Sequence, residues 1–295
     1  MKALVTGATG FLGGGLVSRL LSDGWEVDIL IRDKDEARAD ELIALGVGRA
    51  IVANDASSAH AAVTEVAPDA IAHLATWYLK THTPADIAGL VHSNVEFGTG
   101  VLDAASLLDA RVVLTSSFFQ FLGGRREPAS LYAATKQALA EIASYYADKA
   151  QLDVRETIMY DTYGPGDARD KLVPLLARAA ATGEPARLGS PHQAINLTYL
   201  DDVAAGLAAL MTAEEAPTLT SIRQATPTSV GEVASTLAEL AGHPLDISFR
   251  EDAPTSDLPF TAGDWPTPPG WAPQVPLVEG LRRTVEAVRA SLPTT

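Results

Sequence analysis

Tyr132 and Lys136 stand four residues apart in a stretch whose apolar residues recur with helical spacing. Residues i and i+4 lie on one face of a helix, so the phenol and the ammonium group can reach the same substrate atom. A free tyrosine has a pKa of about 10, and a nearby ammonium group lowers that pKa toward the neutral range. We therefore expect Tyr132 to exchange a proton with a carbonyl or alcohol oxygen, with Lys136 as its electrostatic partner.

A pair of serines, Ser116 and Ser117, ends a short apolar run that indicates a β-strand. Doubly wound sheets bind their ligands at the carboxyl ends of their strands. The hydroxyl of Ser117 could therefore hold a substrate carbonyl while Tyr132 protonates it. A Tyr/Lys pair at this spacing is common on protein surfaces, so the assignment depends on the rest of the chain.

A glycine-rich turn connects the first predicted strand to the first predicted helix. Its three glycines allow a tight turn, a close approach of the backbone to a pyrophosphate, and close packing of the helix on the strand. The helix N-terminus then offers unpaired N–H groups to the phosphates. In this position the pattern predicts a dinucleotide site. The residues expected to contact the dinucleotide here are Gly7, Thr9, Gly10, Phe11, Leu12 and Gly13.

The residue that follows the second predicted strand indicates which dinucleotide binds. NAD-binding chains place a carboxylate about 20 residues past the glycines, where it bonds the ribose hydroxyls. Here the strand ends at Ile31 and Arg32 follows. A guanidinium binds a 2′-phosphate that a carboxylate would repel, so NADP(H) is favoured. Asp33 comes next in the chain, and NAD(H) therefore stays possible.

The first half of the chain alternates apolar strands with Ala/Leu-rich helices. Continuous apolar strands separated by helices predict a parallel sheet covered on both faces and joined by right-handed connections. The predicted fold class is α/β, a doubly wound parallel (Rossmann) sheet. We expect strands at 3–6, 26–31, 50–53, 70–74, 111–114 and 154–159, and helices at 11–22, 35–45, 59–66, within 85–108 and at 132–147.

The character of the chain changes after Tyr163, where proline and glycine become frequent and the helical stretches become shorter. This second part is too irregular to form a separate sheet domain. We expect residues 1–163 to form the NADP-binding domain and residues 164–295 to form mainly a smaller substrate-binding cap. Segments near 195–230 are expected to return to the first domain.

The composition restricts the possible partners. With 22 Lys and Arg against 37 Asp and Glu, the 295-residue chain has a net charge of −15. A negative surface repels phosphate backbones, so no nucleic-acid partner is expected. The chain has no cysteine, which excludes disulfides and thiolate ligands, and no metal site is predicted. No apolar run approaches the roughly 18 residues that span a bilayer, so we expect a cytoplasmic protein without a membrane partner.

Taken together, these features resemble the extended short-chain dehydrogenase/reductases, also called the NAD-dependent epimerase/dehydratase family, over essentially the full length. The matching residues are the three glycines, Asp55, His73-Leu74-Ala75, Asn94, Ser116-Ser117, Tyr132, Lys136, Tyr163-Gly164-Pro165-Gly166 and Asp201-Asp202. The resemblance implies that Ser117, Tyr132 and Lys136 form the catalytic triad. It also implies a homodimer through the two helices that carry Asn94 and Tyr132.

The resemblance extends the ligand site beyond the glycine turn and Arg32. Further cofactor contacts are expected at Asp55, Leu74, Ala75, Thr76, Asn94, Thr115, Tyr132, Lys136 and Tyr160. Of these, Asp55 is implied to lie by the adenine, and Asn94 is more typical of a residue that fixes a helix. His73, at a buried strand end, is expected to be structural. Substrate contacts are expected at Trp77, Phe118, Gln120, Asp161, Arg169, Lys171 and Asn196.

The family contains dehydratases, epimerases and ketoreductases that act mostly on nucleotide sugars. Its 4,6-dehydratases resemble one another in an Asp-Glu pair after the catalytic serine or threonine, where this chain has Phe118-Phe119. Its epimerases generally use NAD, and Arg32 argues against that cofactor. The nearest resemblance is to the 4-ketoreductases of the CDP-abequose synthase type, so reduction of a CDP- or dTDP-linked 4-keto-6-deoxyhexose by NADPH is expected. The arginine that often holds the substrate diphosphate is replaced by Ile195.

Three other functions remain open. The chain could be a nucleotide-sugar epimerase, or it could reduce a small aldehyde or ketone in an apolar pocket. The aromatic residues available to line such a pocket are Trp77, Tyr78, Phe118, Phe119 and Phe121. It could also be a non-catalytic NADP(H) sensor of the NmrA-like kind, although such proteins generally lack the Tyr/Lys pair.

Overall fold

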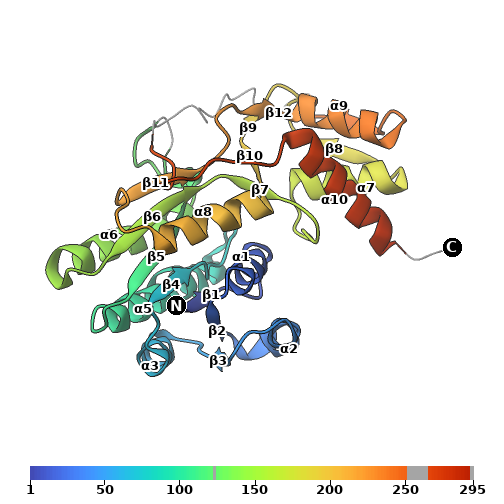
Figure 1. Ribbon diagram of the computed structural model, residues 1–295. Coiled ribbons are helices and arrows are strands. Elements are labelled where there is room, and N and C mark those ends of the chain that lie inside the picture. The colour runs from blue at the N-terminus through green and yellow to red at the C-terminus, as the bar shows by residue number, and fades with distance from the viewer. Residues whose placement is uncertain (122–123, 251–264, 293–295) are drawn as a thin grey trace.

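Seven parallel strands form the central sheet, in the order β11-β6-β5-β4-β1-β2-β3 (Figure 1). The computed structural model describes residues 1–121, 124–250 and 265–292. The strands are β1 (Lys2–Thr6), β2 (Glu26–Ile31), β3 (Ala50–Val52), β4 (Ala70–His73), β5 (Arg111–Ser117), β6 (Val154–Met159) and β11 (Leu219–Ile222). The predicted doubly wound parallel sheet is thus confirmed, and its order reverses between β1 and β4, where such sheets bind dinucleotides.

Helices cover both faces of this sheet, because apolar side chains of its strands point to both faces and form a hydrophobic cluster on each. One face carries α1 (Phe11–Ser22), α2 (Glu36–Ala44) and α8 (Leu200–Thr212). The other face carries α3 (Ala56–Val66), α5 (Phe97–Ala105) and α6 (Leu131–Ala150). The two hydrophobic clusters under these helices form the core that holds the strand ends in place.

The single helix expected within 85–108 is interrupted in the structure. A 3-10 turn η2 (Pro84–Asp86), the short helix α4 (Ile87–Val91) and a π-helical turn η3 (His92–Glu96) precede α5. A π-turn widens the helix by one residue and turns its side chains to new directions, often at functional sites. Here the turn carries the buried Asn94, whose contacts are described below.

The second half of the chain contributes α8 and β11 to the sheet domain and otherwise forms a cap beside it (Figure 1). Its helices α7 (Leu172–Thr182), α9 (Val230–Ala241) and α10 (Leu277–Ser291) share one hydrophobic cluster. Short strands pair around them: β7 (Asp161–Tyr163) with β10 (Leu197–Tyr199), β9 (Ala194–Ile195) with β12 (Thr228–Ser229), and β8 (Ala186–Leu188) with β13 (Ile247–Phe249). In the described part of the chain no helix is both long and apolar enough to cross a bilayer.

Candidate active site

A pocket of about 920 Å³ opens at the carboxyl ends of the central strands. Twenty of the sequence-predicted residues line it: Gly7, Thr9, Gly10, Phe11, Leu12, Gly13, Arg32, Leu74, Ala75, Thr76, Trp77, Thr115, Ser117, Phe118, Tyr132, Lys136, Tyr160, Asp161, Arg169 and Lys171. The glycine turn, with Arg32 and Asn54, forms one end of the pocket, which we call the glycine end. The other, called the aromatic end, is formed by Trp77, Tyr78, Phe118, Phe119 and Tyr160.

Backbone sterics shape the glycine end. Gly7 has φ +70°, and a Cβ added to it would come within 2.8 Å of the backbone nitrogen of Ala75. A Cβ on Gly13 would collide with the backbone of Gly7 and Ala8. Helix α1 begins directly after this turn, and its N-cap Gly10 has no side chain to occupy the first N–H groups. These groups therefore face the pocket, which fits the pyrophosphate of a dinucleotide.

The ends of β1 and β4 are tied together beneath this turn. The Thr6 hydroxyl accepts a hydrogen bond from the Ala75 N–H at 3.1 Å and lies 3.0 Å from Nδ1 of His73. Burial, helped by the charge of Lys136, lowers the pKa of His73 to about 3, so this imidazole is neutral at physiological pH. His73 does not line the pocket. Its contacts are those of a structural residue that joins two strands.

Three charged or amide side chains stand where the ribose of a dinucleotide is expected. Arg32 lines the pocket and forms an ion pair of 2.7 Å with Asp35. Asp33 also lines the pocket, and its backbone N–H donates to the side chain of Asn54 at 3.4 Å. The glycine end therefore presents both a guanidinium and carboxylates, and the sign of the local charge does not by itself choose between the two dinucleotides.

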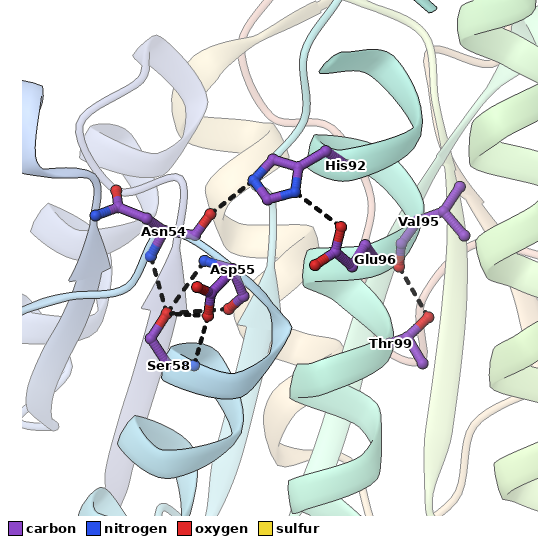
Figure 2. A network of polar contacts seen from close by, with 7 residues as sticks. All are labelled: Asn54, Asp55, Ser58, His92, Val95, Glu96 and Thr99. Atoms are coloured by element: carbon purple, nitrogen blue, oxygen red, sulfur yellow. Dashed lines mark hydrogen bonds and ion pairs between the residues drawn. The ribbon is translucent and has the colours of Figure 1, made fainter. Parts of the chain in front are cut away.

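Asp55 does not line the pocket, in contrast to its predicted place beside the adenine. Figure 2 shows why: its carboxylate accepts from the backbone N–H of Ser58 and from the Ser58 hydroxyl, which makes Asp55 the N-cap of α3. These bonds also lower its pKa. The neighbouring Asn54 lines the pocket instead. A helix that starts one residue earlier in the chain would place Asn54, and not Asp55, at the N-cap.

His92 connects this region to the π-helical turn, a role that no sequence pattern predicted. Its ring nitrogens lie 2.8 Å from the backbone oxygen of Asn54 and 2.8 Å from the Glu96 carboxylate (Figure 2). The bond to Glu96 raises the pKa of His92. His92 also lines the pocket, so the loop after β3 is held in place by a residue 38 positions away.

The predicted catalytic residues meet between the two ends of the pocket. Ser117 ends β5, and Tyr132 and Lys136 lie on the first turns of α6, all three buried. Burial raises the pKa of Tyr132 to about 12, although the hydroxyls of Ser117 and Thr76 lower it in part. The expected lowering of this pKa by Lys136 is not found in this structure: burial is the largest cause of the shift, and Lys136 does not contribute to it. The phenol is therefore protonated at neutral pH.

Lys136 is deeply buried yet lines the pocket. Burial lowers its pKa to about 8, and the negative charge of Glu156 opposes this shift. A lysine with this pKa keeps its ammonium group at neutral pH and loses it in the mildly alkaline range. Lys136 can therefore supply a positive charge and hydrogen-bond donors at the centre of the pocket.

Asn94, one of the expected cofactor contacts, does not line the pocket, because its side chain is fully hydrogen-bonded within the protein. Its amide oxygen accepts from the Thr76 hydroxyl at 3.0 Å and from the Trp77 N–H at 2.6 Å. Its amide nitrogen donates to the Trp77 oxygen and to the Thr135 hydroxyl, each at 3.0 Å. Asn94 thus fixes the loop after β4 against helix α6, and every polar atom of its side chain is used.

Gln120 and Asn196 are also buried away from the pocket, contrary to their expected contact with substrate. The side-chain oxygen of Gln120 accepts the backbone N–H of Ser117 at 2.7 Å, which fixes the end of β5. Asn196 bonds the backbone N–H and oxygen of Gln224, each at 2.9 Å, and so holds the segment after β11. Both residues position the site from behind. Phe121, one of the candidate pocket aromatics, is likewise outside the lining and packs on Trp265.

The aromatic end holds one lysine among its rings. Lys171 lies 3.4 Å from the Asp161 carboxylate and 5.0 Å from the centre of the Tyr78 ring. Tyr78 in turn packs edge-on against Tyr132, with 4.9 Å between ring centres. Phe118 stacks on Tyr160 at 5.4 Å. Such a surface suits a ligand with both flat apolar faces and a negative group.

Arg169 lies between the two ends and is already heavily bonded. Its guanidinium pairs with Asp167 at 2.7 Å, donates to the Thr162 oxygen at 2.8 Å and lies 4.6 Å above the Phe11 ring. It therefore fixes the cap to the glycine turn. Of the two cations predicted to bind substrate, Lys171 has the weaker internal bonds and is the better candidate for a ligand contact.

Comparisons with known proteins agree with this architecture. Residues 3–222 match the model of the NAD dependent epimerase/dehydratase family. A UDP-glucose 4-epimerase of Mycolicibacterium smegmatis is 28% identical over 98% of this chain and 99% of its own length. A CDP-abequose synthase of Salmonella typhimurium is 26% identical over 77% of this chain and 76% of its own.

Among solved structures, the UDP-glucose 4-epimerase of Thermus thermophilus in complex with NAD superposes with a TM-score of 0.79. It covers 99% of this chain and 100% of its own at 22% identity, so it establishes the likeness of fold. The family match spans most of the chain and includes the glycine turn and the Ser117, Tyr132 and Lys136 positions. The chain belongs to the NAD dependent epimerase/dehydratase family.

Proposed function

We propose that the chain reduces the 4-keto group of a nucleotide-linked 4-keto-6-deoxyhexose, a CDP- or dTDP-sugar, with NADPH. The observation that carries this proposal is the meeting of the Ser117 hydroxyl and the protonated Tyr132 phenol between the glycine end and the aromatic end of one pocket. A carbonyl oxygen placed there is within reach of two hydroxyl groups, one to bind it and one to protonate it.

The residues of the chain divide the chemistry as follows. Ser117 donates a hydrogen bond to the carbonyl oxygen, and negative charge develops on that oxygen as the C4–H bond forms. Tyr132 then transfers its phenolic proton to the oxygen, which gives the alcohol. Lys136 holds the nicotinamide ribose and stabilises the phenolate that remains. A bound reduced dinucleotide supplies the hydride.

The protonation state of Tyr132 is compatible with the reductive direction. Because burial raises this pKa to about 12, Tyr132 carries its proton at neutral pH and can donate it without a prior ionisation. The residues after Ser117 also bear on the reaction. Phe118 and Phe119 stand there, so the position lacks the carboxylates that a dehydration of the sugar would use.

A second candidate, nucleotide-sugar 4-epimerisation, is favoured by the Mycolicibacterium smegmatis relative, a UDP-glucose 4-epimerase matched over nearly the full chain. An epimerase must first remove the 4-hydroxyl proton, which requires Tyr132 as a base before it acts as an acid. Tyr132 is placed for either role, and the two reactions differ in whether the reduced cofactor is consumed.

Purified protein should oxidise NADPH in the presence of a CDP- or dTDP-4-keto-6-deoxyhexose and yield the 6-deoxy sugar. The panel should include UDP-glucose and UDP-glucuronate with product analysis, and simple ketones and aldehydes without a nucleotide. Turnover of one keto sugar with stoichiometric NADPH loss supports the reductase. Interconversion of 4-epimers without net cofactor loss would replace it with the epimerase, and turnover of simple carbonyls alone would contradict both.

The preference for NADPH is a proposal that rests on Arg32. Arg32→Ala should weaken the binding of NADPH about tenfold relative to NADH, because one charge-assisted contact to the 2′-phosphate is lost. Arg38→Ala is the matched control, since Arg38 pairs with Glu41 on the same helix and does not line the pocket. An equal affinity of the wild-type protein for the two dinucleotides, measured by titration calorimetry, would refute the preference.

A further inference from the structure

Strand β6 places two charged residues, Arg155 and Glu156, side by side in the interior of the sheet, and both are buried. Successive side chains of a strand point to opposite faces. Arg155 reaches the α8 side, where it bonds Asp153 and the backbone oxygens of Leu210 and Glu214. Its charge is thereby compensated. Glu156 lies on the other face and has a different set of partners.

Glu156 lies directly behind the catalytic end of β5. Its carboxylate accepts a hydrogen bond from the hydroxyl of Ser116, the residue before Ser117, and one of its oxygens lies 3.6 Å from the guanidinium of Arg126. Ser116 lines the pocket, whereas Glu156 does not. A buried carboxylate with one hydrogen bond and one distant cation is costly unless another positive charge compensates it.

The buried Lys136 can supply this charge at longer range, since no ion pair joins it to Glu156 among the described residues. Helix α6 packs on β5 and β6, and Lys136 interacts electrostatically with Glu156 across this interface. The other titratable group that interacts with Lys136 is His73 of β4, which is neutral. The other charged groups on elements against α6 have partners of their own. His92 and Glu96 of η3 bond each other, and Asp103 of α5 bonds Tyr146 near the far end of α6. Arg111 of β5 bonds Asp153 and the backbone oxygen of Met211.

We propose that Glu156 is a positioning residue that keeps Lys136 in its ammonium form and, through Ser116, fixes the end of β5 that carries Ser117. The inference rests on the proposed role of Lys136 in the reaction. Neither Glu156 nor Ser116 touches the reacting atoms; both act through their neighbours. The buried acid compensates the buried base, so the pocket can contain a lysine without the loss of its proton at neutral pH.

The direct test is the titration of the Lys136 amino group, followed by NMR of ¹³Cε-labelled lysine and assigned by comparison with Lys136→Arg. In Glu156→Gln the side chain keeps its shape and its capacity to accept from Ser116 but loses the charge. The midpoint of Lys136 should then fall by about one pH unit. In a pH profile of kcat/KM, the midpoint of the alkaline limb should shift to lower pH by the same amount. The NMR titration needs no turnover, so a failure of the proposed function leaves it interpretable.

Glu141→Gln is the matched control. The Glu141 carboxylate lies 2.8 Å from Arg126, the same arginine that lies near Glu156. Glu141 is on the same helix as Lys136, but it is mostly exposed. Its neutralisation should leave the Lys136 midpoint unchanged. Arg126→Gln serves as the second variant in case Glu156→Gln does not fold. It removes the competing cation from a half-exposed position, so the Lys136 midpoint should rise.

An unchanged Lys136 midpoint in Glu156→Gln would overturn the proposal. An equally large fall of the Lys136 midpoint in Glu141→Gln would also overturn it, because the shift would then be a general response to net charge. Ser116→Ala separates the two parts of the proposal: it keeps the carboxylate, so the Lys136 midpoint should not fall, while kcat should fall because the end of β5 loses its anchor. An unaltered kcat there would remove the role of Ser116.

Discussion

At the glycine end of the pocket the wall is backbone, whereas at the aromatic end it consists of side chains. The glycine end depends on close contacts between β1, β4 and α1, where a single added Cβ would collide with main-chain atoms. The aromatic end depends on rings and on the Lys171–Asp161 pair, all on loops or short elements. Backbone geometry is difficult to vary, and side chains can be exchanged one at a time. The first end therefore suits a ligand shared across a family, and the second suits the substrate that distinguishes its members.

The strongest test of this division lies where the two ends meet. Tyr132→Phe should lower kcat about a thousandfold, because it removes the proton donor while the ring and its contact with Tyr78 remain. NADPH affinity should stay within about twofold, as no glycine-end contact is altered. Steady-state kinetics and cofactor titration measure the two effects. A near-normal kcat would show that the proton comes from elsewhere.

Gly13→Ala tests the claim that the glycine end is made of backbone. The new Cβ would overlap the backbone of Gly7 and Ala8, so stability should fall by about 3 kcal/mol and dinucleotide binding should be lost. Gly14→Ala, one residue further, is the control, since its nearest contacts lie at 3.7 Å. That change should be neutral or stabilising by up to about 1 kcal/mol. Equal effects of the two substitutions in thermal unfolding would contradict the argument.

Lys171→Met addresses the aromatic end alone. If Lys171 contacts a negative group of the substrate, KM for the nucleotide sugar should rise about tenfold with little change in cofactor affinity. Lys149→Met, at the exposed end of α6, provides a control for the loss of one positive charge. An unchanged KM would mean that Lys171 serves only to pair with Asp161 and Tyr78.

The smallest effects are expected from substitutions of the neighbours Asn54 and Asp55, of which the structure places only Asn54 in the pocket. Asp55→Ala should lower the melting temperature by a few degrees and leave dinucleotide affinity intact, whereas Asn54→Ala should weaken affinity. The pKa of Asp55 is lowered in the folded state, so its contribution is complete above the unfolded pKa of about 3.8 and is lost as the pH falls through the lower folded value. The melting temperatures of Asp55→Ala and wild type should therefore converge in acid. A loss of cofactor affinity in Asp55→Ala would restore the expected adenine contact.

Residues whose role follows from local backbone rules were predictable. The glycine turn, the strand ends and the Tyr132/Lys136 spacing each depend on a few neighbouring positions, and the structure brings all of them to one pocket. The parallel sheet followed from apolar runs separated by helices. Its edge strand β11 lies in the segment near 195–230 that was expected to return to this domain, although no strand was predicted there.

Residues whose role depends on depth or on a distant partner were not predictable. The choice between Asn54 and Asp55 depends on the start of α3, which shifts by three residues from the expected 59 to Ala56. The pKa of Tyr132 depends on how completely its neighbours, such as Tyr78 and Phe119, bury it, and the spacing to Lys136 contains no such information. Asn94 and His92 acquire their contacts from a π-turn, and helical periodicity does not reveal one.

The position of β11 in the sheet has a consequence for biosynthesis. Strand β6 ends at Met159, but the strand that completes its open edge begins only at Leu219. At a translation rate of about 5–20 residues per second, the nascent sheet has an unpaired edge for about 3–12 seconds. Such an edge invites pairing with other unfinished chains, and inward charges discourage it. Arg155 and Glu156 lie on that strand. The two charges that are compensated in the folded protein can therefore protect the nascent chain from aggregation on the ribosome.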